Sequence, residues 1–376
     1  MSDFDGLRIA LSSLVAQRRA LETAGQNVAN VNTDGYSRQR VELTAEGGPL
    51  AAAIHSRWTG GGLGVRSTGT ERLRDQFLEL RGYQEHAADA GLARSQGILT
   101  RVELAFAEPG DTGLAALLSD FWAGWDDVAN RPDDLAARTQ LVERATTLAN
   151  GFHQLDSTMA TIRRSSITEL QAMVADVNGT ADRIAELNAQ IQSSVHAGLS
   201  PNELMDQRDL LVSGLSEQIG VAVRPNPDGS GMVDVFVGGT ALVRGTRAEK
   251  LAVTVGTDPA ETVRVEWEKD GYPASPTGQA GALLSAVNDV LPRYRAAVAA
   301  VAQQVHDDVN ALHTGGYAPD GSTGRPFFSM GPEGLEVNAV IAADPRLVAA
   351  AGGPGAPRDG SLAQRLAELS GADDTY

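Results

Sequence analysis

The sequence predicts a mainly α-helical fold with a small antiparallel β module inserted into it, in which long helices form a bundle or a coiled coil. Apolar residues recur at helical spacing along most of the chain, above all over residues 135–196. Between residues 219 and 276 the pattern changes to alternating apolar and polar residues, which is typical of half-buried strands. The 376 residues suffice for two or three domains, each with its own core.

The first helix is predicted from a seven-residue repeat that starts close to the N-terminus. Its apolar stripe consists of Leu7, Ala10, Leu11, Leu14, Leu21, Ala24 and Val28. Such a narrow stripe is typical of a helix that packs in a coiled coil, although an ordinary amphipathic helix in a globular core fits the periodicity equally well. Because an isolated helix of this kind is marginally stable in water, we expect residues 1–31 to be mobile or to dock only against a neighbouring molecule.

A run of turn-forming residues predicts the end of this helix. The segment from Asn30 through Asn32 to Gly35 is rich in Asn, Asp and Gly, and Gly35 can take a positive φ. We expect this turn, with Tyr36 after it, to set the direction between the helix and the next domain. A short strand is predicted over residues 36–44, and a loop at the glycines of 60–64. The spacing of these glycines fits neither of the common phosphate-binding patterns, so no nucleotide site is predicted there.

Three helical segments are predicted after that loop. The first begins at Thr70, which is a suitable N-cap. Its apolar face consists of Leu73, Phe77, Leu80 and Tyr83. The second covers residues 114–129 and the third residues 135–196, in which the Asn-Gly pair at 178–179 is a point where the helix bends or breaks.

The remainder returns to helix after the β module. A capping box, Ser-Pro-Asn-Glu at 200–203, predicts the start of a helix that leads into the module. A long helical segment follows the module, with a kink or a new start at Pro292, and a short helical run is predicted at 361–369. The predicted division is an N-terminal coiled-coil helix with its turn (1–33), the first part of a helical domain (34–218), a small antiparallel β domain (219–276), and the return helix with the rest of the helical domain (277–376).

Composition excludes several classes of protein. The net charge of −17 disfavours binding to a phosphate backbone, so no nucleic-acid partner is expected. The absence of cysteine excludes disulfides, thiol nucleophiles and cysteine-ligated metals. No apolar stretch reaches the length of a membrane helix, so no membrane insertion is expected. The acidic start does not resemble a signal peptide, and we expect any export to proceed without a cleaved signal.

Polar clusters in the sequence do not predict a catalytic, cofactor or metal site. His306 and His313 are seven residues apart, about 10 Å along a helix, which is too far to share one zinc ion. They are interpreted as solvated or interfacial residues. Asp206 and Asp209 flank Arg208, which would keep both carboxylates ionised. This cluster is interpreted as an exposed structural ion pair that sets helix register or an interface.

Aromatic residues are concentrated in the predicted helix at 114–129. Phe121, Trp122 and Trp125 lie at helical spacing and are interpreted as core residues, with a binding surface as the alternative.

The N-terminal segment resembles a known motif. Residues 10–41, ALSSLVAQRRALETAGQNVANVNTDGYSRQRV, are similar to the start of the flagellar axial proteins, the family of rod, hook and hook-associated proteins. The matching positions are Asn27, Ala29, Asn30, Asn32, Thr33, Gly35, Tyr36 and Arg38. Asp34 stands where most of these proteins have proline, and it is also a turn residue. Three further stretches, at 60–81, 202–221 and 278–328, are similar to the hook-associated branch of the family.

The resemblance implies a structural protein of the bacterial flagellum without enzymatic activity or cofactor. It would be exported through the flagellar type III channel, act outside the cell, and join hook to filament as a ring of identical copies. The implied partners are the hook protein, a second hook–filament junction protein and an export chaperone. The implied assembly residues are Leu7, Leu11, Leu14, Leu21, Val28, Asn30, Asn32, Gly35 and Tyr36.

Other functions stay open at this point. A hook or rod protein is the alternative within the family, and a secreted coiled-coil adhesin or a peptidoglycan hydrolase is the alternative outside it. The family also ends in a second helical segment that packs beside the N-terminal helix. No such heptad pattern occurs before Tyr376, so we expect a C-terminal part to be missing from this chain, with a divergent short protein as the alternative.

Overall fold

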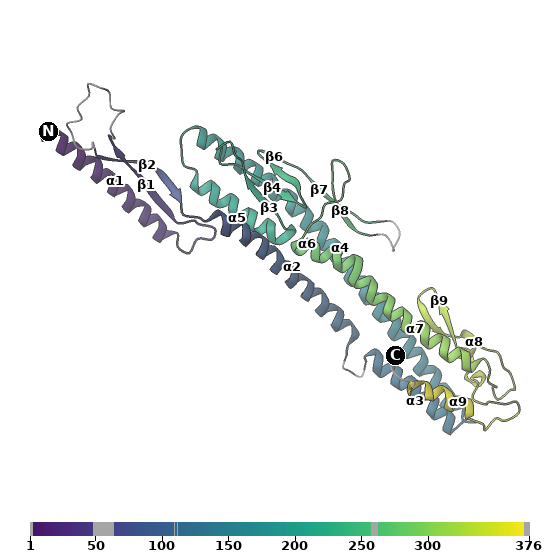
Figure 1. The fold of residues 1–376 in the computed structure, drawn as a ribbon. Helices are drawn as coiled ribbons and strands as arrows, with labels where there is room; N and C mark the ends of the chain where they lie inside the picture. Colours follow the sequence, from purple (N-terminus) through teal and green to yellow (C-terminus); the bar gives the residue numbers. More distant parts are fainter. Residues whose placement is uncertain (1–2, 48–63, 109, 111, 257–261, 372–376) are drawn as a thin grey trace. The chain divides into compact units, whose positions relative to one another are not determined.

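The computed structural model describes residues 3–47, 64–108, 110, 112–256 and 262–371 (Figure 1). The chain forms two compact units. Unit 1 consists of Met1–Arg94 and Leu170–Ala282, and unit 2 of Ser95–Glu169 and Leu283–Tyr376. The predicted segments 34–218 and 277–376 therefore each contribute residues to both units.

Unit 1 begins with a helix and a β-hairpin. Helix α1 (Asp3–Ala29) is followed by the antiparallel strands β1 (Gln39–Glu46) and β2 (Gly64–Arg72). The predicted glycine loop lies outside the described residues except for Gly64, the first residue of β2.

The predicted start of the next helix at Thr70 is wrong, because Thr70 pairs with Val41 inside the hairpin. Helix α2 (Gln76–Phe106) begins later, where the Asp75 carboxylate accepts hydrogen bonds from the backbone N–H groups of Phe77 and Leu78. Of the predicted apolar face, Tyr83 is buried, whereas Phe77 is 72% exposed.

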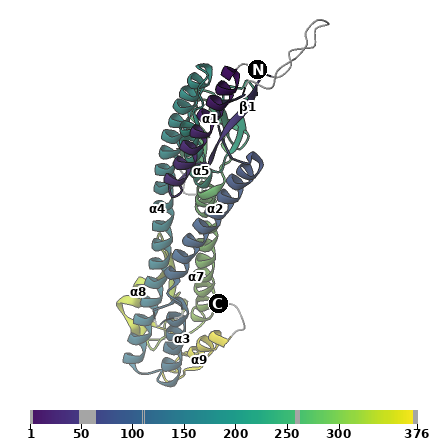
Figure 2. The ribbon, with the colours of Figure 1, turned by 90° about the vertical axis from the view of Figure 1, so that its left-hand side faces the viewer.

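Helix α4 (Leu135–His196) has the predicted bounds, and Figures 1 and 2 show it as an unbroken helix. The predicted bend at 178–179 is absent because the side chain of Asn178 bonds outward. Its amide exchanges two hydrogen bonds with the backbone of Leu251, at 2.8 and 2.9 Å. Helix α5 (Asn202–Ile219) follows, but its N-cap is Pro201 and makes no side-chain cap bond, so the predicted capping box is wrong.

The β module has the predicted place and antiparallel topology. Its four-stranded sheet has the order β3 (Ala222–Pro225), β4 (Val233–Val237), β5 (Thr240–Arg244) and β6 (Arg247–Ala248). A second pair consists of β7 (Leu251–Thr254) and β8 (Arg264–Trp267). Asn188 of α4 is fully buried beneath the sheet. Its Nδ2 donates to the carbonyls of Val233 (2.8 Å) and Gly245 (2.7 Å), and its Oδ1 accepts from the Val233 N–H.

Unit 2 is built from helices and one short hairpin. Helix α3 (Leu114–Asn130) precedes α4, and the return helix consists of α6 (Gly278–Ser285), the π-helical turn η1 (Ala286–Val290) and α7 (Leu291–His313). The hairpin of β9 (Phe328–Gly331) and β10 (Gly334–Val337) was not predicted. The remaining elements are α8 (Ala339–Ala343), η2 (Pro345–Leu347), α9 (Ser361–Ala367) and η3 (Glu368–Gly371).

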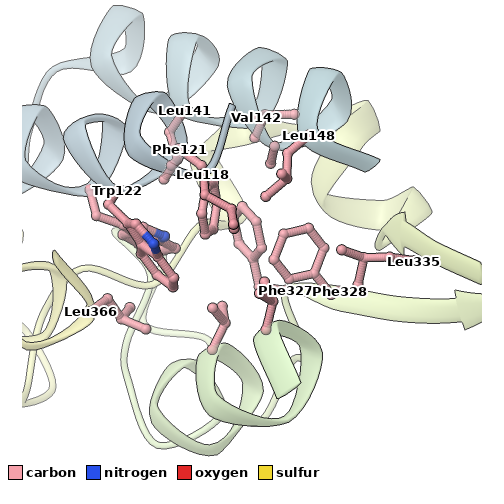
Figure 3. Packing of buried hydrophobic residues seen from close by; sticks show 14 of the residues in the cluster. Leu118, Phe121, Trp122, Leu141, Val142, Leu148, Phe327, Phe328, Leu335 and Leu366 are labelled. Atoms are coloured by element: carbon pink, nitrogen blue, oxygen red, sulfur yellow. The ribbon is translucent and has the colours of Figure 1, made fainter. Parts of the chain in front are cut away.

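The core of unit 2 is an aromatic cluster (Figure 3). Phe121, Trp122 and Trp125 of α3 are at most 6% exposed, which confirms their interpretation as core residues. They meet Phe327 and Phe328, with the Phe121 ring centroid 5.4 Å from that of Phe328 and the Trp125 centroid 5.1 Å from that of Phe327. Tilted and edge-on pairs of this kind add to the stability that burial of the rings provides.

His313 is a buried member of this core, so the prediction that it is solvated or interfacial is wrong. Its Nδ1 lies 2.8 Å from the Arg325 carbonyl, and its Nε2 accepts the backbone N–H of Ala349 at 2.9 Å. The ring is therefore neutral, with its proton on Nδ1. Burial, and to a smaller extent the charges of Arg325 and Arg138, lower the pKa of His313 from 6.5 to about 4.

The lowered pKa of His313 predicts a loss of stability in acid. Below pH 6.5 His313 binds a proton in the unfolded chain, whereas in the folded chain it stays neutral until the pH falls to about 4. The free energy of unfolding should fall by about 3 kcal/mol across this window. Denaturation across that pH range, followed by circular dichroism, should show this fall, and His313→Gln should flatten it. Parallel curves for the two proteins would contradict the assignment.

Asn188→Ala is expected to lower the free energy of unfolding by about 2 kcal/mol or more, because it leaves buried backbone groups of the β module without a partner. Gln190→Ala is the matched control, since Gln190 is exposed on the same helix. Chemical denaturation of both variants tests this expectation. Equal, small effects would mean that Asn188 does not anchor the module.

Candidate functional site

Helix α1 has two different faces. Leu7, Leu11, Leu14, Leu21 and Val28 are between 63% and 75% exposed. We call these five side chains the leucine face. The other side of the helix packs against the chain itself, through half-buried or buried residues at three- and four-residue spacing: Ile9, Ser12, Ala16, Ala20, Thr23 and Asn27. Most of these side chains are small, which lets the helix lie close to its partner.

The partner of this second face is the hairpin of β1 and β2, beside which α1 lies in Figure 1. Near the start of the helix, the Ser12 hydroxyl accepts the backbone N–H of Val65 at 3.2 Å. Near its end, Asn27 Nδ2 donates to the Gln39 carbonyl and Asn27 Oδ1 accepts the Gln39 N–H, both at 2.9 Å. The expectation that residues 1–31 dock only against a neighbouring molecule is therefore wrong: the helix docks on its own hairpin and leaves the leucine face uncovered.

The turn after α1 is held by side chains of the motif. Asn30 is half-buried and its Oδ1 accepts the Thr33 hydroxyl, whereas Asn32 is exposed. The Tyr36 hydroxyl donates to Asn27 Oδ1 at 2.9 Å. Burial and the nearby carboxylates of Asp206 and Glu203 raise the pKa of Tyr36, so the hydroxyl remains a donor.

Gly35 has a φ of 77°, which confirms the predicted positive value. A Cβ at this position would lie 3.1 Å from the Cβ of Leu210 on α5. The left-handed conformation and the close approach to α5 both favour glycine here.

A buried ion network connects the hairpin to α5. Arg72 Nη1 lies 2.8 Å from an Asp206 oxygen and 2.7 Å from an Asp209 oxygen, and Arg74 Nη1 lies 2.8 Å from the same Asp209 oxygen. Asp206 also accepts the backbone N–H of Ser37 at 3.0 Å. Burial alone would lower the pKa of Arg72, but the two carboxylates outweigh it and raise the pKa.

Arg208 extends the network to the β module. Its guanidinium donates to Asp209 Oδ1 and, at 2.7 Å, to the carbonyl of Gly231 between β3 and β4. Asp206, Arg208 and Asp209 are each at most 8% exposed. The prediction of an exposed pair is therefore wrong, and Arg72, rather than Arg208, contacts both carboxylates. The network holds the turn, the hairpin, α5 and the β module together.

Asn27 and Arg72 hold this site together, but neither is among the predicted assembly residues. Asn27 belongs to the motif, and its polar side chain in the middle of a helix was a usable signal. No local pattern indicated Arg72, because its partners are more than 130 residues away in sequence. Within the described residues, no group of three or more His, Asp or Glu side chains is arranged to hold a metal ion, and no helix is long and apolar enough to cross a membrane.

Comparison with known proteins identifies the family. A model of the flagellar hook-associated protein FlgK helical domain matches residues 99–328, more than half of the chain. The chain belongs to the flagellar hook-associated protein FlgK family. A model of the flagella basal body rod protein also matches residues 7–36, which contain α1 and the turn.

Individual relatives agree with this membership. The chain is 34% identical to flagellar hook-associated protein 1 of Salmonella typhimurium over 333 residues, 86% of this chain and 59% of that protein. It is 35% identical to the protein of the same name from Bacillus subtilis over 238 residues, 61% of this chain and 45% of that one. The chain thus spans about half the length of these relatives.

A solved structure, that of the flagellar hook junction protein FlgK from Burkholderia pseudomallei, has a similar fold. The TM-score is 0.58 at 27% sequence identity, and the match covers 67% of this chain and 47% of that one. This similarity confirms the mainly helical fold with small antiparallel sheets.

Arg72→Met is expected to lower the free energy of unfolding by about 3 kcal/mol, because it leaves two buried carboxylates without their shared counter-charge. Arg40→Met is the matched control on the same hairpin, where Arg40 pairs with Glu71 at the surface and the change should have little effect. Urea denaturation followed by circular dichroism compares the two. If both variants were equally stable, the network would not be what holds the hairpin to α5.

Proposed function

We propose that this chain is a structural component of the bacterial flagellum that joins hook to filament, and that it catalyses no reaction. Membership of the FlgK family supports this proposal. The single observation that carries it within the structure is the leucine face: a row of large apolar side chains stays exposed on a helix whose other face is already packed. Exposed apolar rows of this length mark interaction surfaces.

The proposed mechanism is lateral packing of helices. Each large apolar side chain that is buried between helices contributes about 1.5–3 kcal/mol, so the five side chains of the leucine face together favour assembly strongly. Asn27, the turn and the buried ion network would fix the direction in which α1 leaves the rest of unit 1. Copies that present α1 in one direction can form a closed ring.

The proposed partners follow from the family. They are further copies of the chain, the hook protein, a second hook–filament junction protein and an export chaperone. We further propose export through the flagellar type III channel without a cleaved signal, and a final location outside the cell. Asn30, Asn32, Gly35 and Tyr36 would act by setting the turn, rather than by contacting partners through large apolar surfaces.

The alternatives receive less support. A hook or rod protein would account for the match at residues 7–36, but the match at residues 99–328 is to the FlgK helical domain. No observation favours a secreted adhesin or a peptidoglycan hydrolase.

Leu14→Gln combined with Leu21→Gln should abolish or strongly reduce swimming in cells whose only copy carries both changes. The fold should be retained, because both side chains are more than 60% exposed in the isolated chain. Leu104→Gln is the matched control, since Leu104 is 74% exposed on a different helix. Motility in soft agar and thermal melting of the purified proteins are the measurements.

Normal swimming by the double variant would contradict assembly through the leucine face. A large fall in the melting temperature would also do so, because it would place these leucines in the fold of the chain itself.

A further inference from the structure

The return helix contains an irregular turn close to the point where the chain passes from unit 1 to unit 2. The second segment of unit 2 begins at Leu283, and the π-helical turn η1 follows at Ala286–Val290. In this turn the Leu291 N–H bonds to the Ala286 carbonyl, five residues earlier, rather than to a carbonyl four residues earlier. Turns of this kind are rare, and they mark places where a helix bends.

Proline causes a defect in the hydrogen bonds of this turn. Pro292 lies in the first turn of α7 and has no N–H. In the spacing of a π-helix, that missing N–H would have bonded to the carbonyl of Val287. Val287 is fully buried, so water cannot readily take the place of the missing donor.

Arg163 of α4 supplies the donor. Its Nε lies 3.2 Å from the Val287 carbonyl oxygen. One turn beyond η1, Arg295 of α7 makes a two-pronged ion pair with Asp156 of α4, at 2.7 and 2.8 Å. Helix α7 is thus bound to α4 directly after the turn by an ion pair, and the Val287 carbonyl within the turn is bound by the Arg163 side chain.

We propose that η1 is a hinge in the return helix and that Arg163 is its latch. With the bond to Val287 in place, the turn is closed and its backbone is satisfied. When that bond opens, the buried carbonyl loses its side-chain donor and the turn is free to bend. This assignment does not depend on the proposed flagellar function.

Hydrogen exchange of the purified chain, resolved to the amides of Ala286–Val290 and Leu291, tests the proposal. These amides should exchange faster than those in the middle of α7. Arg163→Met should speed their exchange about tenfold further, as expected for loss of a charged hydrogen bond. Arg164→Met is the matched control, because the guanidinium of Arg164 bonds to Thr161 on its own helix, and it should leave this exchange unchanged.

A double-mutant cycle with Pro292→Ala separates a latch from general destabilisation. Alanine restores the missing N–H, so Arg163→Met should have little effect in the Pro292→Ala background. An equal effect in both backgrounds would overturn the proposal. So would slow exchange at η1 in the unaltered chain, or an Arg163→Met effect no larger than that of Arg164→Met. Circular dichroism of each variant shows whether it remains folded.

Discussion

The two carboxylates of Asp206 and Asp209 are the constraint on which unit 1 depends. Both are buried, and a buried carboxylate is tolerated only where cations and hydrogen-bond donors surround it. Here the donors come from the N-terminal turn, from strand β2 and from α5 itself, and Arg208 reaches on to the β module. These segments must therefore come together in one arrangement. Helix α1 is part of this arrangement because Asn27 and Ser12 form hydrogen bonds with the hairpin.

In unit 2 an aromatic core takes the place of the ion network. Phe121 and Trp125 from α3 meet Phe327 from the segment after α7, and His313 fits among them as a neutral ring with both nitrogens bonded. Each unit thus buries ionisable side chains that are paired, Asp206 and Asp209 in unit 1 and His313 in unit 2. In both units the partners come from segments far apart in the sequence, so the polar groups specify which segments meet.

Long periodic segments could be predicted from the sequence, and pairings between distant segments could not. The bounds of α4 and the positive φ of Gly35 follow from local patterns, apolar spacing in one case and a run of turn formers in the other. Strand β2 was missed because its sequence, GVRSTGTER, has almost no apolar residues and owes its pairing to β1 and α1. Because β2 is predicted as part of a loop and of the following helix, the docking of α1 on the hairpin could not be predicted either. Likewise, the burial of Asp206 and His313 depends on residues that no local window contains.

The two faces of α1 both repeat every seven residues. One register contains Ile9, Ala16 and Thr23. The other register lies two residues earlier, about 200° around the helix, and contains Leu7, Leu14 and Leu21. A helix with two such opposite seams is bifacial. The hairpin occupies one seam, so a further helix cannot pack there. The hairpin is thus both a support for α1 and a cover for one of its two seams, while the other seam stays exposed.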